Sequence, residues 1–321
     1  MPETTLLVLH DPTARHLALL DRLPPGVRIV ASDSAGGLRA AAPEARALLV
    51  GGGPYRAALE ALWPEFRKLE WIHALSAGLE GLLFPALAES PVTLTNSAGV
   101  FARSLAEFAL AGMLYFAKDL ARMKRQQAAA EWTCFDVEEL HGRTLAIVGY
   151  GAIGRATAAR AHAFGMKIHA LRRSGPGEDP LVSRWFAREA LDGMLAGADY
   201  LLISAPLTPE TRGLIDARRL ALLPPHAVLI NVGRGPVAEE AALIAALREG
   251  RLRGAVLDVF DVEPLPAEHP FWRMENVLLS PHTADHTATW LNEAMEFFLD
   301  NFERWAAGKP LLNVTRKHLG Y

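Results

Sequence analysis

The sequence predicts an α/β protein of two domains, each a parallel sheet flanked by helices, one of them a doubly wound Rossmann domain that binds a dinucleotide. Short apolar runs that suit buried strands alternate with alanine-rich helical runs along most of the chain. A glycine-rich turn between one such strand and the next helix has the spacing of a dinucleotide-binding loop. At 321 residues the chain is long enough for two domains.

The glycine-rich turn joins the apolar run 145–148 to a helix predicted over residues 153–164. Gly149, Gly151 and Gly154 complete the pattern G-x-G-x-x-G. The first glycine permits a tight turn, the second lets the backbone approach a pyrophosphate, and the third lets the helix pack closely on its strand. The alternative is an ordinary strand-to-helix turn, but the elements on both sides favour a dinucleotide site.

The N-terminal part of the chain predicts a smaller parallel domain. Apolar runs at 6–9, 47–50 and 71–75 are each followed by turn residues. Because the carboxyl ends of parallel strands gather at one edge of a sheet, the loop 76–81 is a candidate ligand loop. An ordinary turn is the alternative reading of that loop.

The middle of the chain predicts one long helix. Ser104 and Glu107 have the spacing of a capping box, and apolar residues continue from there to the basic segment 122–125. These residues spread round much of the helix circumference, which suits a helix that bridges domains or packs on a second subunit. A homodimer is therefore expected.

The second half of the chain continues the doubly wound sheet. Further strands are expected at 166–171, 198–207, 227–232, 255–260 and 276–280. A last helix after Pro281 carries apolar residues at helical spacing and is expected to pack back on the first domain. Residues 1–96 with 286–321 are thus predicted to form a substrate-binding domain, and residues 97–285 the dinucleotide-binding domain.

Composition narrows the function. Half of the residues are apolar, the formal net charge is −3, and no basic block is present, which argues against nucleic-acid binding and favours a small-molecule partner. Cys134 is the one cysteine, so intramolecular disulfides and zinc sites built from thiolates are excluded; it is expected to be a small, partly buried hydrophobic residue. No apolar run has membrane-spanning length and the N-terminus lacks the form of a signal peptide, so a soluble, cytoplasmic protein is expected.

Three polar residues follow buried strands in the second half: Arg234, Glu263 and His282. Strand ends converge at one crevice in this fold, so these side chains are candidates for a common site. Each also has a simpler explanation. Arg234 could bind phosphate or a surface acid, Glu263 could cap a turn, and His282 could be a hydrogen-bonded core histidine.

Five segments together resemble the successive signatures of the D-isomer-specific 2-hydroxyacid dehydrogenases. They are residues 149–154, 205–211, 231–237, 257–265 and 280–284. The resemblance covers roughly residues 70 to 320 and implies a hydride transfer between a nicotinamide cofactor and a small 2-oxoacid, giving the D-2-hydroxyacid. A reductase of glyoxylate or hydroxypyruvate is the expected member.

The resemblance also implies roles for individual residues. Arg234 would hold the carboxylate and carbonyl of the substrate, and His282 would protonate the carbonyl oxygen. Glu263 would hydrogen-bond that imidazole and favour its protonated form. Backbone N–H groups of Gly78 and Leu79 would bind the substrate carboxylate.

The cofactor is expected to be NADP(H), with NAD(H) as the alternative. NAD-preferring members place an acidic residue at the end of the second strand, where this chain has Arg172, Arg173 and Ser174. Two arginines and a hydroxyl suit a 2′-phosphate, whereas the competing explanation is a pair of exposed arginines. Asp258 would hold the nicotinamide carboxamide, and no metal is expected. The expected cofactor-binding positions are Gly149, Gly151, Ala152, Ile153, Gly154, Arg155, Arg172, Arg173, Ser174, Ala205, Pro206, Thr211, Val232, Gly233, Arg234, Asp258, His282 and Ala284.

Other activities remain open at this point. Formate dehydrogenases are disfavoured because they have glutamine where this chain has Glu263, and no regulatory domain is expected beyond the last helix. A dehydrogenase for a bulkier 2-oxoacid, an unusual oxidation such as that of phosphite, and a dinucleotide-sensing scaffold of the corepressor type would all retain much of this pattern.

Overall fold

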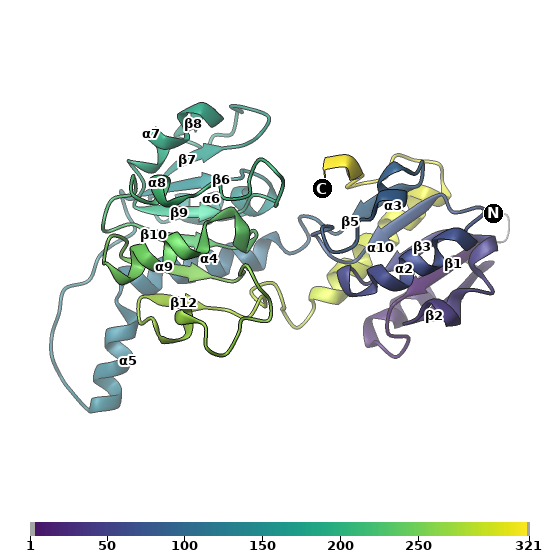
Figure 1. The fold of residues 1–321 in the computed structure, drawn as a ribbon, viewed down its shortest axis with the longest axis horizontal. Coiled ribbons are helices and arrows are strands. Elements are labelled where there is room, and N and C mark those ends of the chain that lie inside the picture. The colour runs from purple at the N-terminus through teal and green to yellow at the C-terminus, as the bar shows by residue number, and fades with distance from the viewer. Residues whose placement is uncertain (1–3, 320–321) are drawn as a thin grey trace. The chain divides into compact units, whose positions relative to one another are not determined.

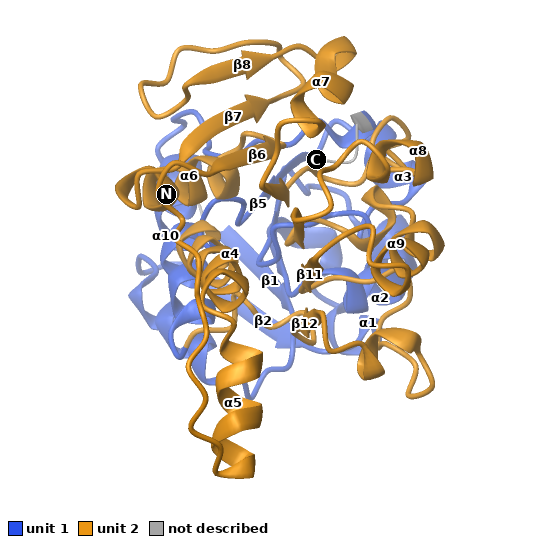
Figure 2. Cartoon of the chain, turned by 90° about the vertical axis from the view of Figure 1, so that its left-hand side faces the viewer, with its two compact units in different colours: residues 1–101, 288–321 blue, residues 102–287 orange. Residues whose placement is uncertain are grey.

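The computed structural model describes residues 4–319, which divide into two compact units. Unit 1 comprises residues 1–101 and 288–321, and unit 2 comprises residues 102–287, so the chain leaves unit 1 and later returns to it. Figure 2 colours the two units. Within residues 4–319 no helix is long and apolar enough to cross a bilayer.

Unit 1 is built on a five-stranded parallel sheet in the order β2-β1-β3-β4-β5 (Figure 1). Its strands are β1 (Thr4–Leu9), β2 (Val27–Ser32), β3 (Ala45–Val50), β4 (Trp71–Ala74) and β5 (Thr93–Asn96). Its α-helices are α1 (Ala35–Leu38), α2 (Arg56–Leu62), α3 (Pro85–Glu89) and α10 (Trp290–Ala306). The three strands predicted here are present, and β2 and β5 are additional.

Helix α10 packs against the sheet of unit 1, as predicted. Trp71 on β4 is fully buried and stacks on Phe298 of α10, with ring centroids 5.5 Å apart and planes inclined by 13°. Phe302 and Trp305, one and two turns further along α10, contact the same indole. Aromatic burial of this kind is a large contribution to stability, so the C-terminal helix completes the core of the N-terminal sheet.

Unit 2 is a seven-stranded parallel sheet in the order β12-β11-β10-β9-β6-β7-β8. Its strands are β6 (Thr144–Val148), β7 (Lys167–Leu171), β8 (Arg184–Phe186), β9 (Tyr200–Ile203), β10 (Val228–Asn231), β11 (Gly254–Leu257) and β12 (Val277–Leu279). Its α-helices are α4 (Ala102–Ala117), α5 (Leu120–Ala129), α6 (Ala152–Ala163), α7 (Leu191–Leu195), α8 (Ala217–Leu220) and α9 (Glu240–Arg248). The strand order reverses between β6 and β9, which is the switch point of a Rossmann sheet, where dinucleotides bind. The predicted fold class is confirmed.

Short 3-10 helices complete the described chain. They are η1 (Arg15–Arg22), η2 (Ala42–Glu44), η3 (Gly53–Tyr55), η4 (Trp63–Glu65), η5 (Arg188–Ala190), η6 (Gly235–Val237), η7 (Pro270–Arg273) and η8 (Lys317–Leu319).

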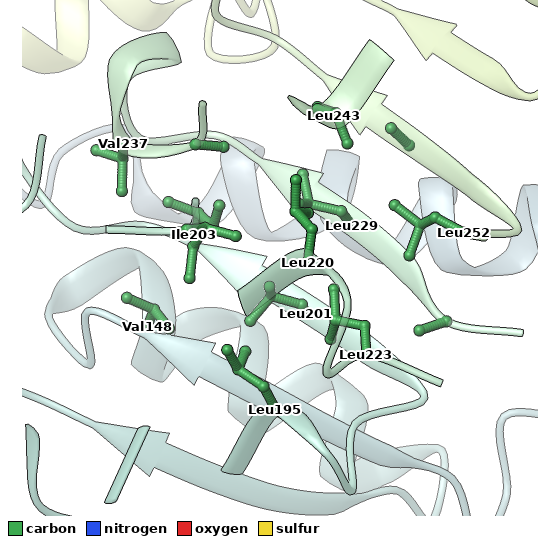
Figure 3. Packing of buried hydrophobic residues seen from close by; sticks show 14 of the residues in the cluster. Val148, Leu195, Leu201, Ile203, Leu220, Leu223, Leu229, Val237, Leu243 and Leu252 are labelled. Carbon is green, nitrogen blue, oxygen red and sulfur yellow. The ribbon is translucent and has the colours of Figure 1, made fainter. Parts of the chain in front are cut away.

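The core of unit 2 is aliphatic. Val148, Ile203 and Leu229 project from three neighbouring strands towards helix residues such as Leu195 and Leu243 (Figure 3). Because both faces of a parallel sheet are covered, these strands consist of nearly continuous apolar residues, which is why most of them could be recognised in the sequence.

The single long helix and the capping box predicted for the middle of the chain are wrong. The helix ends at Ala117 and a second one, α5, begins at Leu120, because Asp119 adopts a left-handed conformation (φ +46°) and its side chain caps the new helix by accepting a hydrogen bond from Arg122 N. Ser104 lies inside the first turn of α4, which begins at Ala102, and its hydroxyl donates to a distant carbonyl described below.

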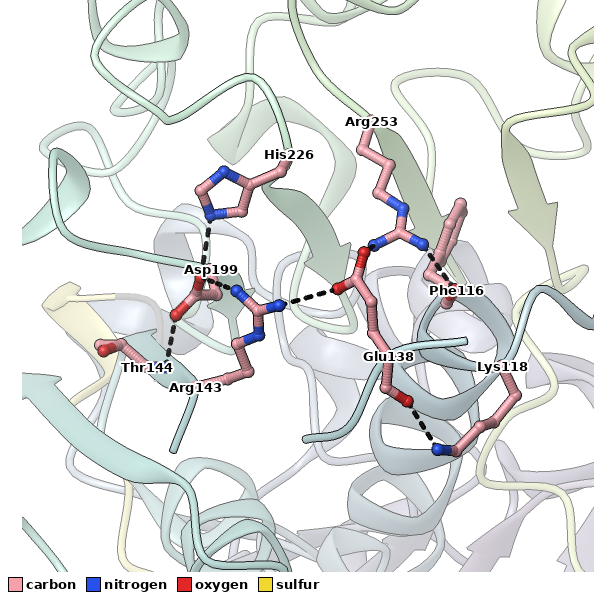
Figure 4. A network of polar contacts seen from close by, with 8 residues as sticks. All are labelled: Phe116, Lys118, Glu138, Arg143, Thr144, Asp199, His226 and Arg253. Atoms are coloured by element: carbon pink, nitrogen blue, oxygen red, sulfur yellow. Dashed lines mark hydrogen bonds and ion pairs between the residues drawn. The ribbon is translucent and has the colours of Figure 1, made fainter. Parts of the chain in front are cut away.

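Helix α5 and the return segment 130–139 form a projecting arm of unit 2 (Figure 2). Cys134 lies in this segment and is exposed, contrary to the prediction that it is partly buried. The base of the arm is fixed by Glu138, whose carboxylate binds Arg143 at 3.2 Å and Arg253 at 2.8 Å (Figure 4). The arm is therefore anchored firmly at its base.

Candidate active site

The glycine-rich turn lies at the switch point of unit 2. Gly149 follows β6 with φ +99°, and a Cβ added there would lie 2.5 Å from the backbone nitrogen of Ala205, which follows β9. Ser204 Oγ donates to Gly149 O at 2.8 Å, and Gly149 N donates to Leu171 O at 3.0 Å. Only glycine fits this position, and the turn is held against the ends of the neighbouring strands.

The other two glycines have different surroundings. A Cβ on Gly154 would lie 2.7 Å from Gly149 O, so this residue allows α6 to approach the turn. A Cβ on Gly151 would meet no atom within 4 Å among the described residues. The backbone at Gly151 is thus open beside the first turn of α6, whose leading N–H groups have no partner inside the helix. This arrangement fits a pyrophosphate.

Arg234 is positioned by the segment that follows β10. Asn231 Oδ1 accepts a hydrogen bond from Gly233 N at 3.1 Å, and its Nδ2 donates to Arg234 O at 3.0 Å. The guanidinium Nη1 donates to Gly233 O at 2.7 Å. Asn231, which the sequence did not single out, therefore fixes the backbone on both sides of the predicted substrate-binding arginine.

Glu263 and His282 form a pair in unit 2. His282 Nδ1 and Glu263 Oε2 are 2.6 Å apart, and Phe260 N donates to the other carboxylate oxygen, Oε1, at 2.9 Å. The hydrogen bond to Glu263 raises the pKa of His282 above its ordinary value, although burial opposes this shift. Burial alone would raise the pKa of Glu263, but the hydrogen bonds from His282 and Phe260 hold it below its usual value.

The charge of Arg234 acts on both members of this pair. It acts to lower the pKa of Glu263 and opposes the net rise in the pKa of His282, which puts Arg234 within electrostatic range of the pair in unit 2. With Nδ1 bonded to a carboxylate, His282 has Nε2 as its second hydrogen-bonding atom. An acid–base group beside a permanent cation can bind and protonate an anionic carbonyl compound.

The turn that carries His282 is held by Asp258 at the end of β11. Asp258 Oδ1 accepts hydrogen bonds from Thr283 N at 3.0 Å and Ala284 N at 3.1 Å. Burial raises the pKa of Asp258, which is 1% exposed. Ala284 O in turn accepts a hydrogen bond from Ser104 Oγ at 2.6 Å, which is the contact that replaces the predicted helix cap. His282 itself has φ +56°, so its backbone depends on this support.

The arginines expected to bind a 2′-phosphate follow β7. Arg172 Nε donates to Gly175 O at 3.0 Å, and its guanidinium lies over the Trp185 ring at 5.2 Å. Arg173 and Ser174 are exposed. Arg155, at the start of α6, forms an ion pair with Asp179 at 2.8 Å.

The remaining cofactor positions lie around the switch point. The loop 205–211 folds on itself, since Thr211 Oγ1 donates to Pro206 O at 2.7 Å and accepts from Thr208 N at 2.8 Å. Ala205 and Val232 are buried next to the glycine-rich turn and β10. No group of three or more His, Cys, Asp or Glu residues within residues 4–319 is arranged to hold a metal ion.

Gly78 and Leu79 lie in unit 1, in the loop after β4. Ser76 Oγ donates to Gly78 O at 2.8 Å, and Asn96 Nδ2 donates to Ala77 O at 2.6 Å. Leu79 is 1% exposed and anchors the loop in the core of unit 1. Two side chains thus hold the carbonyl groups of this loop, which orients the intervening peptide groups.

Comparisons with known proteins identify the family of this chain. The family model described as "D-isomer specific 2-hydroxyacid dehydrogenase, NAD binding domain" matches residues 110–284. A glyoxylate/hydroxypyruvate reductase B from Yersinia pestis is 35% identical over 288 residues, covering 87% of this chain and 85% of that protein.

Solved structures of similar proteins belong to the same family. A D-isomer specific 2-hydroxyacid dehydrogenase from Xanthobacter autotrophicus Py2, in complex with NADPH and MES, is 32% identical with a TM-score of 0.85 and covers 100% of both chains. An NADPH-dependent glyoxylate/hydroxypyruvate reductase from Sinorhizobium meliloti, in complex with NADP and malonate, is 28% identical with a TM-score of 0.79, covering 99% of this chain and 98% of that one. The chain therefore belongs to the D-isomer specific 2-hydroxyacid dehydrogenase family.

Proposed function

We propose that this protein is an NADPH-dependent reductase that converts a small 2-oxoacid, glyoxylate or hydroxypyruvate, to the D-2-hydroxyacid. The observation that carries the proposal is the His282–Glu263 pair, 2.6 Å apart, within the field of Arg234 in a Rossmann unit. Names of relatives support the substrate class, since the Yersinia and Sinorhizobium proteins are glyoxylate/hydroxypyruvate reductases.

Different residues of unit 2 bind the substrate, donate the proton and position the proton donor. The planar guanidinium of Arg234 binds the carboxylate and carbonyl oxygens and favours charge that develops on the carbonyl oxygen. A nicotinamide dinucleotide held at the glycine-rich turn would supply the hydride that reduces the carbonyl carbon. His282, kept protonated by Glu263, donates its Nε2 proton to the carbonyl oxygen. Asp258 holds the turn that carries His282 and is assigned to the nicotinamide carboxamide.

Unit 1 is assigned to substrate binding, with Gly78 and Leu79 donating backbone N–H groups to the carboxylate. Residues 1–96 and 286–321 are the proposed substrate-binding domain, and residues 97–285 the dinucleotide-binding domain. The braced loop after β4 supports this assignment, because fixed peptide dipoles bind anions without reorganisation.

NADP(H) is the proposed cofactor, with NAD(H) as the weaker ligand. Arg172 and Arg173 occupy the strand end where a carboxylate would otherwise select the ribose 2′-hydroxyl. The Xanthobacter and Sinorhizobium structures contain NADPH or NADP.

A cytoplasmic homodimer is part of the proposal. The arm formed by α5 and residues 130–139 has no buried residue within α5, while Met123 is 40% exposed and Trp132 is 98% exposed. Apolar side chains on a firmly anchored projection favour a protein partner, and a second copy is the simplest one. The exposed thiol of Cys134 suits a reducing compartment. Light scattering of the wild type and of Trp132→Ala tests the dimer: a monomeric wild type would contradict it.

The proposed reaction is tested by following oxidation of NADPH and NADH with glyoxylate, hydroxypyruvate, pyruvate and phenylpyruvate. Rapid turnover of glyoxylate and hydroxypyruvate with NADPH, abolished in His282→Ala and Arg234→Ala, is the expected result. Tight NADPH binding without turnover of any 2-oxoacid would overturn the reductase and favour a dinucleotide-sensing scaffold.

A further inference from the structure

A half-buried carboxylate, that of Asp179, lies beside the glycine-rich turn, in the segment between β7 and β8. Asp179 Oδ2 accepts hydrogen bonds from the Tyr150 hydroxyl at 3.1 Å and from Arg155 Nε at 2.8 Å, while Oδ1 accepts from Leu181 N at 3.1 Å. The Asp179 side chain is 10% exposed and that of Arg155 is 65% exposed. The carboxylate is thus nearly closed off, and its cation is at the surface.

A series of contacts leads from Asp179 to the loop after β7 that carries Arg172, Arg173 and Ser174, called here the arginine loop. The Tyr150 ring meets the Trp185 ring edge-on, with centroids 5.0 Å apart, and the guanidinium of Arg172 lies over the same indole at 5.2 Å. Arg172 Nε also donates to Gly175 O at 3.0 Å, within the turn that leads towards Asp179. The carboxylate, the glycine-rich turn and the first arginine therefore form one packed unit.

The charge state of Asp179 matters for binding of a 2′-phosphate. The hydrogen bond from Leu181 N, together with Arg155 and Tyr150, lowers the pKa of Asp179, so the carboxylate is ionised at neutral pH. Burial first and then the bond to Asp179 raise the pKa of Tyr150 to about 12, so its hydroxyl keeps the proton that it donates. An uncompensated carboxylate so near the arginine loop would repel a 2′-phosphate.

We propose that Asp179, Arg155 and Tyr150 form a clasp that sets the preference for a 2′-phosphorylated dinucleotide. In this clasp Arg155 is the counter-ion of Asp179 rather than a ligand of the pyrophosphate, and Asp179 acts as a positioning residue for the loop that carries Arg172. The inference rests on the proposed NADP(H) preference and changes the role expected for Arg155.

The test compares equilibrium dissociation constants of NADPH and NADH, measured by isothermal titration calorimetry on the full-length protein. In Arg155→Gln, Asp179 loses its cation, and the ratio of NADPH to NADH affinity should fall roughly tenfold. The double variant Arg155→Gln, Asp179→Asn removes the uncompensated negative charge and should restore that ratio to within about twofold of the wild type. Arg160→Gln is the matched control, because Arg160 lies on the same helix and pairs with Glu107 at 3.0 Å; its ratio should not change.

Equal weakening of NADPH and NADH in Arg155→Gln would overturn the clasp, because it would identify Arg155 as a ligand of a group that both dinucleotides share. An unchanged ratio, or a double variant no better than the single one, would also overturn it. Failure of the proposed cofactor preference is a separate result, since the wild type would then bind NADH at least as tightly as NADPH before any substitution is made.

Discussion

Glu263 Oε2 is hydrogen-bonded to Nδ1 of His282, while Oε1 of the same carboxylate accepts a hydrogen bond from Phe260 N. The carboxylate therefore cannot rotate away without losing a backbone hydrogen bond as well as its ion pair. This two-point attachment couples the geometry of His282 to its protonation, because the same contact that orients the ring raises its pKa.

Glu263→Gln should move the pH dependence of the reduction. A raised pKa means that His282 stays protonated to higher pH, so reduction is supported below that pKa and declines as pH rises through it. Glutamine removes the negative charge, so the alkaline limb of kcat/KM for 2-oxoacid reduction should shift to lower pH. Oxidation of the hydroxyacid needs neutral His282 and should gain at low pH. Profiles that superimpose for wild type and variant would contradict the pairing role.

Arg234→Lys should lower kcat/KM for the 2-oxoacid by roughly 10- to 100-fold, although the positive charge is kept. An ammonium group cannot reproduce the planar two-point contact with a carboxylate. Steady-state kinetics measure the loss, and calorimetry should show a clearly smaller loss of NADPH affinity, because Arg234 is also an expected cofactor-binding position. A loss of dinucleotide affinity equal to the kinetic loss would place Arg234 on the cofactor instead of the substrate.

Gly149→Ala should lower stability, whereas Gly151→Ala should lower NADPH affinity. Alanine at 149 meets Ala205 N and requires φ +99°, so it should reduce the free energy of unfolding by ~2 kcal/mol or more. Alanine at 151 meets no described atom within 4 Å, so stability should be nearly unchanged while NADPH affinity falls. Urea unfolding and calorimetry measure the two effects. Normal NADPH binding by Gly151→Ala would argue against a pyrophosphate at this turn.

His73 should make unit 1 sensitive to acid. This residue is fully buried, and burial lowers its pKa to about 3 from an unfolded value near 6.5. Because the folded state holds the neutral form, its contribution to stability is complete above pH 6.5 and is lost progressively as pH falls towards 3, by a few kcal/mol. His73→Leu should be less stable at neutral pH, since bonds to Thr95 and Ser97 are lost, yet show a smaller decline between those pH values. An equally steep decline would assign the acid sensitivity to other groups.

Local signals account for what the sequence predicted well. The strand, turn and helix around Gly149 were located to within one or two residues, because glycine spacing and apolar runs depend only on residues that are close together in the sequence. Strands β2, β5 and β8 were missed, and all three lie at sheet edges. In β2 and β8 exposed and buried residues mix, and β5 has the mostly polar sequence Thr-Leu-Thr-Asn, so the apolar pattern is weak in each. The helix break at Asp119 was missed because a polar residue within an apolar pattern reads as one more exposed helical position.

The candidate site also contains residues that the sequence predicted and residues that it did not. Arg234, Glu263 and His282 could be placed together because strand order brings strand ends to one edge, whatever the loops do. Asn231, Asp179 and Ser104 could not, because each contact depends on the path of a loop: Ser104 reaches a carbonyl 180 residues away.

The return of the chain to unit 1 has a consequence for biosynthesis. Trp71 is synthesised long before Phe298. Its indole, which stacks on Phe298 in the folded protein, therefore lacks this cover while all of unit 2 is translated. Unit 2 is contiguous in sequence, whereas the core of unit 1 is complete only after α10 has been synthesised. A nascent or truncated chain that ends before residue 290 therefore exposes an aromatic surface that chaperones and proteases recognise. Synthesis of α10 is the step that covers this surface.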